Sequence, residues 1–152
     1  MLRVTRLTDY ATVVLTVLAE QGDAVHSATG LAERSRVEPS TVAKVLKSLA
    51  QAGLVESFRG ASGGYRLARP ASQISLRSVV EALEGPLAMT TCSVHNGECD
   101  LEIHCGIRAG WQHINDVVTD ALSRTTLADM LAPPPAPHRN PKAIPAALVH
   151  SS

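Results

Sequence analysis

Apolar residues recur at helical spacing along the first fifty residues and predict three helices. In the first helix they fall on one face, at Leu7, Ala11, Val14, Leu15 and Leu18. Ser27 is a good N-cap for a short second helix over residues 28–35. Pro39 suits the first position of the third helix, because the N–H that proline lacks would have no partner there. We expect this helix to run to about Ala52, where Gly53 can end it in a left-handed conformation.

The pattern then changes to short strands. Residues 54–58 and 65–68 predict a β-hairpin around the turn Arg59-Gly60-Ala61-Ser62-Gly63-Gly64. A fourth helix is expected over residues 74–84, and Gly85-Pro86 ends it.

A long helix follows an irregular stretch, residues 87–105. Its apolar positions alternate spacings of four and three, a seam that suits pairing with another helix. The seam consists of Ile107, Trp111, Ile114, Val118 and Ala121. Leu127, Met130 and Leu131 are expected to dock on the rest of the protein. The Pro-rich residues 133–152 offer no face to bury, so we expect a disordered tail.

The order helix, helix, turn, helix, hairpin is that of a winged helix-turn-helix, in which the third helix enters the major groove of DNA. The polar face of that helix presents Ser40, Thr41, Lys44 and Lys47. In the wing, Gly60, Ser62 and Gly63 let the backbone approach phosphates, and Arg59 can contact a phosphate or the minor groove. A polar helix face alone usually means only solvation. The preceding helix and the hairpin, in this order, favour double-stranded DNA as the partner.

Composition narrows the class of protein only slightly. Aromatic residues make up 3% of the 152 residues, so the core must be aliphatic, which favours packed helices. The net charge is zero, but residues 1–70 carry nine basic and six acidic residues, and residues 71–152 carry five and eight. No stretch is long and apolar enough to predict a membrane span, and no signal peptide is recognisable. Three cysteines within fourteen residues do not suit a secreted disulfide framework, which indicates the cytoplasm.

The cysteines follow the pattern Cys92-x₆-Cys99-x₅-Cys105. Thiolates are soft ligands that favour iron–sulfur clusters, Zn²⁺ or Cu(I). Zinc sites usually contain closer pairs, so the long spacings favour a cluster over a single ion. Thiols that respond to redox state without a metal remain an alternative at this point.

The segments LTDYATVVLTVLA and LAERSRVEPSTVAKVLKSLAQAGLVESFRGASGGYRLAR, with three cysteines ahead of a long helix, resemble the IscR/NsrR-type family of winged-helix regulators. The resemblance covers about residues 1–131 and is closest to the branch that regulates the SUF iron–sulfur assembly operon. It implies a homodimer that binds an inverted-repeat operator, a recognition helix at 39–52 and a long dimerisation helix. It also implies that Cys92, Cys99 and Cys105 hold a cluster which controls DNA binding. We expect the regulator to be a repressor.

The fourth cluster ligand differs between members of this family. IscR-type members have a histidine three residues after the last cysteine, where this chain has Arg108. NsrR-type members use an N-terminal carboxylate of the other subunit, and Asp9 in LTDYA matches that position. The rival ligands are His95, Glu98, Glu102 and His104, and Asp9 also suits a helix N-terminus without any ligand role. We expect a [2Fe–2S] cluster, with [4Fe–4S] as the alternative.

The sequence thus predicts a mainly α protein with a small β-hairpin wing. Its expected parts are a winged helix-turn-helix (1–86), a cluster-binding loop (87–106), a dimerisation helix with a docking segment (107–132) and the tail (133–152). Other readings are a redox-thiol or nitric-oxide sensor of the same fold, and an interaction module that does not bind DNA. An enzyme is disfavoured, because no nucleophile–base set, phosphate-binding turn or paired carboxylates are recognisable.

Overall fold

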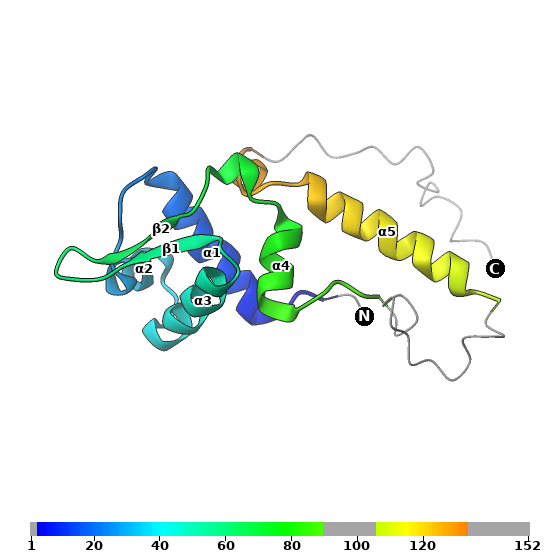
Figure 1. Ribbon diagram of the computed structural model, residues 1–152, viewed down its shortest axis with the longest axis horizontal. Helices are drawn as coiled ribbons and strands as arrows, with labels where there is room; N and C mark the ends of the chain where they lie inside the picture. The colour runs from blue at the N-terminus through cyan, green and yellow to red at the C-terminus, as the bar shows by residue number, and fades with distance from the viewer. Residues whose placement is uncertain (1–2, 90–105, 134–152) are drawn as a thin grey trace, which may run out of the picture.

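The computed structural model describes residues 3–89 and 106–133, which form a helical protein with one two-stranded hairpin (Figure 1). The elements in order are α1 (Arg6–Glu20), α2 (Ala28–Ser35), α3 (Pro39–Gln51), β1 (Val55–Phe58), β2 (Gly64–Leu67), the 3₁₀ turn η1 (Ala71–Gln73), α4 (Leu76–Glu84), α5 (Arg108–Arg124) and α6 (Leu127–Leu131). The predicted fold class, mainly α with a small hairpin wing, is confirmed.

Local sequence signals explain where α2 and α3 begin and where α3 ends. Ser27 caps α2 by accepting a hydrogen bond from the Gly30 N–H at 3.0 Å, and Pro39 opens α3. Gly53 follows α3 with φ +72°, the left-handed conformation that glycine adopts without strain.

One aliphatic core lies where α1, α2, α3 and α4 meet. Its largest fully buried side chains are Leu15, Leu18, Leu31, Leu46, Leu49, Leu54, Ile74, Leu127, Val14, Val42, Val45 and Val79. They include Val42, Val45, Leu46 and Leu49 of α3, and their burial turns the polar side of that helix outward.

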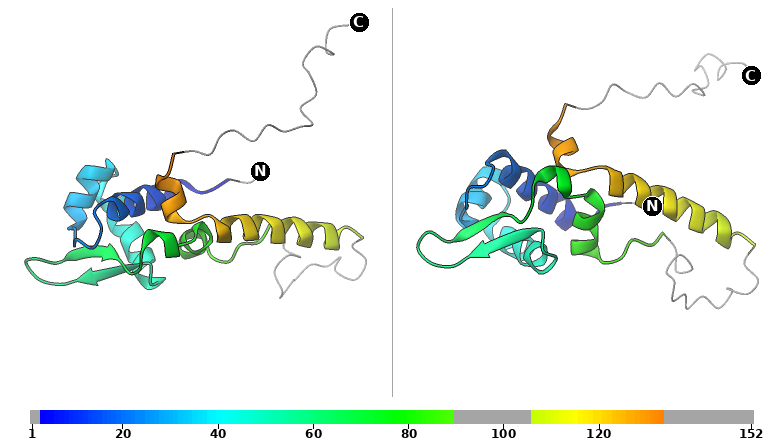
Figure 2. Two further views of the ribbon diagram at one scale, coloured as in Figure 1. Left: turned by 90° about the horizontal axis from the view of Figure 1, so that it is seen from above. Right: turned by 45° about the horizontal axis from the view of Figure 1, so that its top comes forward.

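The hairpin is an antiparallel pair with register Val55 to Leu67 and Phe58 to Gly64, and it extends away from the helices (Figures 1 and 2). It is also tied to the loop before α2, a contact that the sequence did not predict. His26 and Tyr65 exchange two backbone hydrogen bonds of 2.8 and 2.7 Å. A Cβ on Gly64 would lie 2.3 Å from the His26 carbonyl oxygen, so glycine is required at this close approach.

Helix α5 projects from the body, and the chain then returns through α6 (Figures 1 and 2). Two backbone hydrogen bonds close this return, from Leu76 N–H to the Thr125 oxygen (2.9 Å) and from Leu127 N–H to the Ile74 oxygen (2.8 Å). Leu127 is fully buried, as expected for a docking residue. Met130 and Leu131 remain 50% and 39% exposed, because the five-residue α6 has only one face against the body.

Candidate nucleic-acid interface and cluster region

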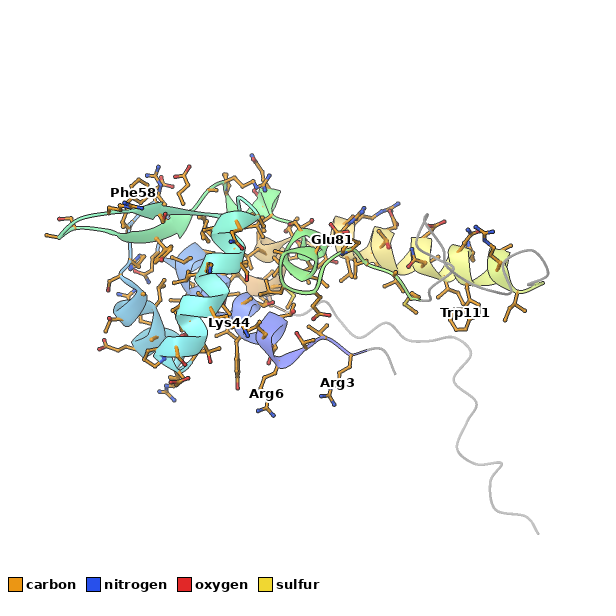
Figure 3. All side chains as sticks on the ribbon, turned by 60° about the horizontal axis from the view of Figure 1, so that its bottom comes forward. Arg3, Arg6, Lys44, Phe58, Glu81 and Trp111 are labelled. Carbon is orange, nitrogen blue, oxygen red and sulfur yellow. The ribbon has the colours of Figure 1, made fainter. Side chains whose placement is uncertain are left out.

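Helix α3 presents its polar side to solvent. Ser40, Lys44 and Lys47 are exposed and Thr41 is half-buried, while Val42, Val45, Leu46 and Leu49 anchor the opposite side. Neither lysine forms an ion pair with a described residue. Figure 3 shows Lys44 on the same side of the molecule as Arg6 and Arg3. The structure therefore brings cationic and hydroxyl side chains to one accessible helix face.

The wing tip is shaped by glycine. Arg59, Gly60 and Ser62 are exposed, and Gly60 has φ +105°. A Cβ on Gly63 would lie 2.3 Å from the Phe58 carbonyl oxygen, so the turn excludes any larger residue there. These four predicted wing residues lie together at the end of the hairpin. Such a narrow, side-chain-poor tip can approach a phosphate backbone closely.

The strands of the wing hold a stacked pair that sequence reasoning missed. The Arg66 guanidinium lies 4.9 Å from the centre of the Phe58 ring and 3.0 Å from a Glu56 carboxylate oxygen. Glu56 faces Arg66 across the strands, and Phe58 lies on the same face two residues on. The alternation of the strand places Glu56 and Phe58 on one face, but only the register of the two strands shows that Arg66 lies opposite them. Arg66 is thus occupied within the wing, while Arg59 has no ion-pair partner among the described residues.

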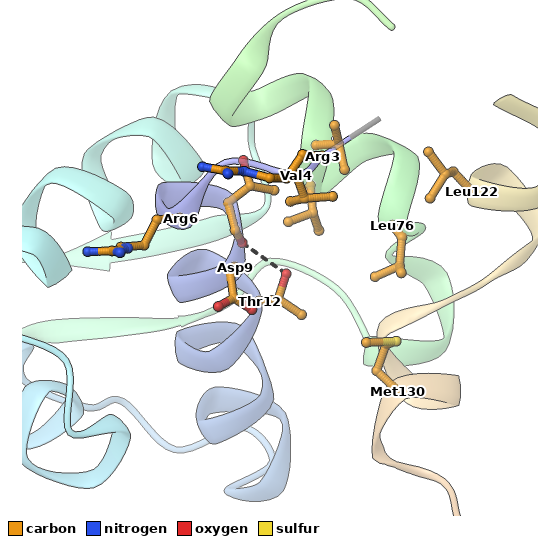
Figure 4. Close-up of a pocket in the computed structure, with 11 residues that line it drawn as sticks. Arg3, Val4, Arg6, Asp9, Thr12, Leu76, Leu122 and Met130 are labelled. Carbon is orange, nitrogen blue, oxygen red and sulfur yellow. Dashed lines mark hydrogen bonds between the residues drawn. The ribbon is translucent and has the colours of Figure 1, made fainter. Parts of the chain in front are cut away.

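Asp9 lies in the first turn of α1, exposed, beside a groove of about 550 Å³ (Figure 4). Leu76, Leu122 and Met130 line its apolar side, and Arg6, Asp9 and Thr12 line its polar side. The Asp9 carboxylate has no hydrogen-bond or ion-pair partner within the described part of the chain. It is accessible to a group brought by another molecule.

Cys92, Cys99 and Cys105 lie outside the described residues, as do the rival ligands His95, Glu98, Glu102 and His104. Within residues 3–89 and 106–133, no group of three histidine, cysteine or acidic side chains could hold a metal ion. The chain that leads into the cysteine segment is joined to α5, since Met89 N–H donates to Asn115 Oδ1 at 3.1 Å. The donor set, three thiols and an accessible carboxylate, fits an iron–sulfur cluster chemically.

Glu84, at the end of α4, is fastened to the start of α1, which no local sequence pattern indicated. One of its carboxylate oxygens accepts hydrogen bonds from the Thr5 N–H (2.9 Å) and the Thr8 hydroxyl (2.6 Å). Thr8 is 1% exposed, and its hydroxyl also lies 3.1 Å from the Thr5 hydroxyl, so these two partners replace water as its hydrogen-bond partners. These hydrogen bonds, the one from Thr8 first, lower the pKa of Glu84 below its ordinary value of 4.5. The contact joins the helix that carries Asp9 to the chain that leads into the cysteine segment.

Replacing Glu84 with Gln is expected to destabilise the protein at pH 7, by at most about 1 kcal/mol because the carboxylate is exposed and screened. A lowered folded-state pKa stabilises the fold above the unfolded-state pKa, and this contribution is lost as the pH falls through the folded-state pKa. The difference between wild type and Glu84→Gln should therefore shrink below about pH 4.5. Urea unfolding from pH 7 to pH 3 measures it, and a difference that stays constant over this range would contradict the assignment.

The apolar side of α5 is open to solvent. Ile107, Trp111 and Ile114 are 65%, 37% and 43% exposed, Val117 is 55% exposed, and none of the helix is buried. Of the predicted seam, Val118 is half-buried and Ala121 exposed. Val117 is an exposed apolar residue that the heptad spacing did not include. Figure 3 shows Trp111 on the part of α5 that lies far from the winged-helix body.

Among the described residues, no helix is long and apolar enough to cross a membrane.

Comparison with known proteins gives consistent matches. The model of the Rrf2 family, described as an iron-dependent transcriptional regulator, matches residues 4–133. Protein aau3 of Rhizobium meliloti is 34% identical over 131 residues, which are 86% of this chain and 85% of that protein. The regulator IscR of Vibrio vulnificus is 31% identical over 102 residues, 67% of this chain and 60% of IscR. The structure of CymR, the global cysteine regulator of B. subtilis, superposes with a TM-score of 0.70 at 28% identity, covering 86% of this chain and 96% of CymR.

Proposed function

This chain belongs to the Rrf2 family of transcriptional regulators, and on that premise we propose that it binds an inverted-repeat operator as a homodimer under the control of an iron–sulfur cluster. The family consists of regulators and not of enzymes. The proposed targets are iron–sulfur assembly genes, which the protein would repress. The proposed compartment is the reducing cytoplasm, where three neighbouring thiols remain available as ligands.

The packing of α3 is the observation that most directly supports DNA binding by this face of the protein. Four buried apolar residues hold the helix against the core and leave its polar side accessible along its length. Ser40, Thr41, Lys44 and Lys47 would read base edges in the major groove. The hairpin tip, with Arg59, Gly60, Ser62 and Gly63, would contact phosphates or the minor groove beside it.

Two substitutions test this surface. Arg59→Ala should weaken operator binding, and the loss should shrink at high salt, because one phosphate contact fewer lowers the salt dependence by about one unit of slope. Lys44→Ala should lower discrimination at one base pair per half-site by about 5- to 150-fold, if Lys44 reads a base. Mobility shifts on operator and scrambled DNA at two salt concentrations measure both effects. Arg124→Ala, on α5, is the matched control, and wild-type behaviour of the Arg59 and Lys44 variants would remove α3 and the wing from the interface.

In the proposed cluster site, the thiolates of Cys92, Cys99 and Cys105 supply three ligands and Asp9 of the partner subunit supplies the fourth. The free Asp9 carboxylate at an open groove supports this choice. When bound, the cluster supplies sensitivity to iron, oxygen or nitric oxide. A ligand from the first helix of one subunit would then link the occupancy of the site to the position of the other subunit's winged helix.

The similarity to CymR supports a second candidate, a sensor of thiol chemistry. CymR is named a global cysteine regulator, and its fold covers most of this chain. In this alternative Cys92, Cys99 and Cys105 would respond to oxidants directly, without a metal. Iron and sulfide content after anaerobic purification separates the two candidates.

A further inference from the structure

The N-terminal end of α3 contains an arrangement that the proposed DNA contacts do not explain. Glu38 is the N-cap residue of the helix, yet its side chain forms no hydrogen bond to the helix backbone. Instead, its carboxylate oxygen Oε2 accepts a hydrogen bond from the Ser40 hydroxyl and lies 3.5 Å from the Thr41 hydroxyl. Ser40 and Thr41 stand in the first turn of α3, and their hydroxyl groups are among the proposed DNA contacts.

We propose that Glu38 is a specificity-determining residue of the DNA-binding surface, and that it selects a cytosine in each half-site. The inference rests on the proposed role of α3 in the major groove. Glu38 would thus increase sequence discrimination, whereas the cationic side chains of Lys44 and Arg59 would increase affinity for DNA.

The first argument concerns the direction of the hydrogen bonds. A serine or threonine hydroxyl has one proton to donate and two lone pairs that accept. Because the Ser40 hydroxyl donates to Glu38, and Thr41 is oriented toward the same oxygen, both can meet a base only as acceptors. The second carboxylate oxygen of Glu38 is a further acceptor, since Glu38 is exposed and forms no ion pair with a described residue.

The second argument concerns what DNA offers to acceptors. In the major groove only the amino groups of cytosine (N4) and adenine (N6) donate hydrogen bonds. The adenine amino group lies beside the acceptor N7, which repels a carboxylate, whereas the cytosine amino group lies beside a C–H. A carboxylate at the leading end of α3 therefore matches cytosine best, and it is repelled by the acceptors of guanine and thymine.

The third argument concerns cost. A negative charge among DNA phosphates weakens binding to every sequence, so Glu38 increases discrimination at the expense of affinity. Among the described residues no ion pair neutralises Glu38, and the lysines of α3 stand at positions 44 and 47, one and a half turns or more along the helix.

Selection of binding sites from a random duplex library with the full-length protein tests the proposal. Wild type should select a cytosine at one position of each half-site. Glu38→Gln keeps the shape but removes the charge, and it should lower the preference for cytosine about tenfold while raising affinity for scrambled DNA severalfold. Glu20→Gln, at an exposed position at the end of α1, removes the same charge outside α3 and should leave both quantities unchanged.

A second variant separates the carboxylate from the hydroxyls. Ser40→Ala combined with Thr41→Val should lower the preference for cytosine, because the carboxylate is no longer held, but affinity for scrambled DNA should not rise. If Glu38→Gln selects the same bases with the same preference as wild type, the proposal is wrong although the protein binds DNA. If wild type selects no sequence at all, the proposed function fails together with it.

Discussion

Replacing Trp111 or Ile114 with Glu is expected to dissociate the proposed homodimer into monomers and to abolish tight operator binding. Both side chains belong to the exposed apolar side of α5, which has no buried residue of its own. In a twofold symmetric interface each substitution occurs twice, so two carboxylates would have to be buried without partners. Since each buried charge costs several kcal/mol, the dimer dissociation constant should rise more than 1,000-fold.

Sedimentation equilibrium of the two variants measures this effect, and their circular dichroism should match that of wild type, because α5 contributes nothing to the buried core. Val25→Glu provides the control, since Val25 is exposed to a similar extent (37%) in the loop before α2. It should leave the dimer intact. A Trp111→Glu protein that remains dimeric would place the subunit interface elsewhere, and the inverted-repeat proposal would lose its geometric basis.

Replacing any one of Cys92, Cys99 and Cys105 with Ala is expected to give a colourless protein that contains almost no iron or sulfide. Losing one thiolate leaves an iron atom without a strong ligand, so each cysteine should be individually necessary. The variants should still fold, because residues 3–89 and 106–133 form a buried core among themselves. Anaerobic purification, visible absorbance and iron and sulfide analysis measure the loss, and mobility shifts measure the accompanying loss of control over DNA binding.

Asp9→Ala should behave differently from the cysteine variants. Carboxylate is a harder ligand than thiolate, so the cluster should survive with an altered spectrum while its control over DNA binding is lost. His104→Ala serves as the matched variant for a ligand within the cysteine segment. If His104→Ala changes the spectrum and Asp9→Ala does not, the proposed link between subunits is wrong. A wild-type protein that carries no iron after anaerobic purification would favour the thiol-sensing alternative.

The sequence predicted the body of the molecule well because that part follows local rules. Ser27, Pro39 and Gly53 determine where helices begin and end through their own backbone chemistry, and the spacing of apolar residues predicted which side of α3 is buried. The turn of the wing was likewise predictable, since its glycines are typical of a tight turn. These features depend on residues that lie a few positions apart.

Features that join distant parts of the chain were not predictable in the same way. The hydrogen bond between Thr8 and Glu84 spans 76 positions, and the backbone pairing of His26 with Tyr65 has no sequence signature at either end. The exposed side of α5 was predicted only in part. The heptad spacing predicted Val118, which is half-buried, and did not include Val117, which is exposed. Helix α5 lies against α4 on one side, and a single sequence does not reveal which turn of the seam faces its own body.

The return of the chain through α6 affects the order in which a newly synthesised molecule can fold. Leu127 fills the same core as Leu15 and Leu46, and the backbone bonds around Ile74 and Leu76 need Thr125 and Leu127 as partners. Translation adds residues at about 5–20 per second, so the winged helix emerges from the ribosome seconds before the residue that completes its core. During that interval the surface proposed to contact DNA exists only in an incompletely packed form. A nascent chain stalled before Thr125 should accordingly be far more sensitive to protease than one released after Leu131.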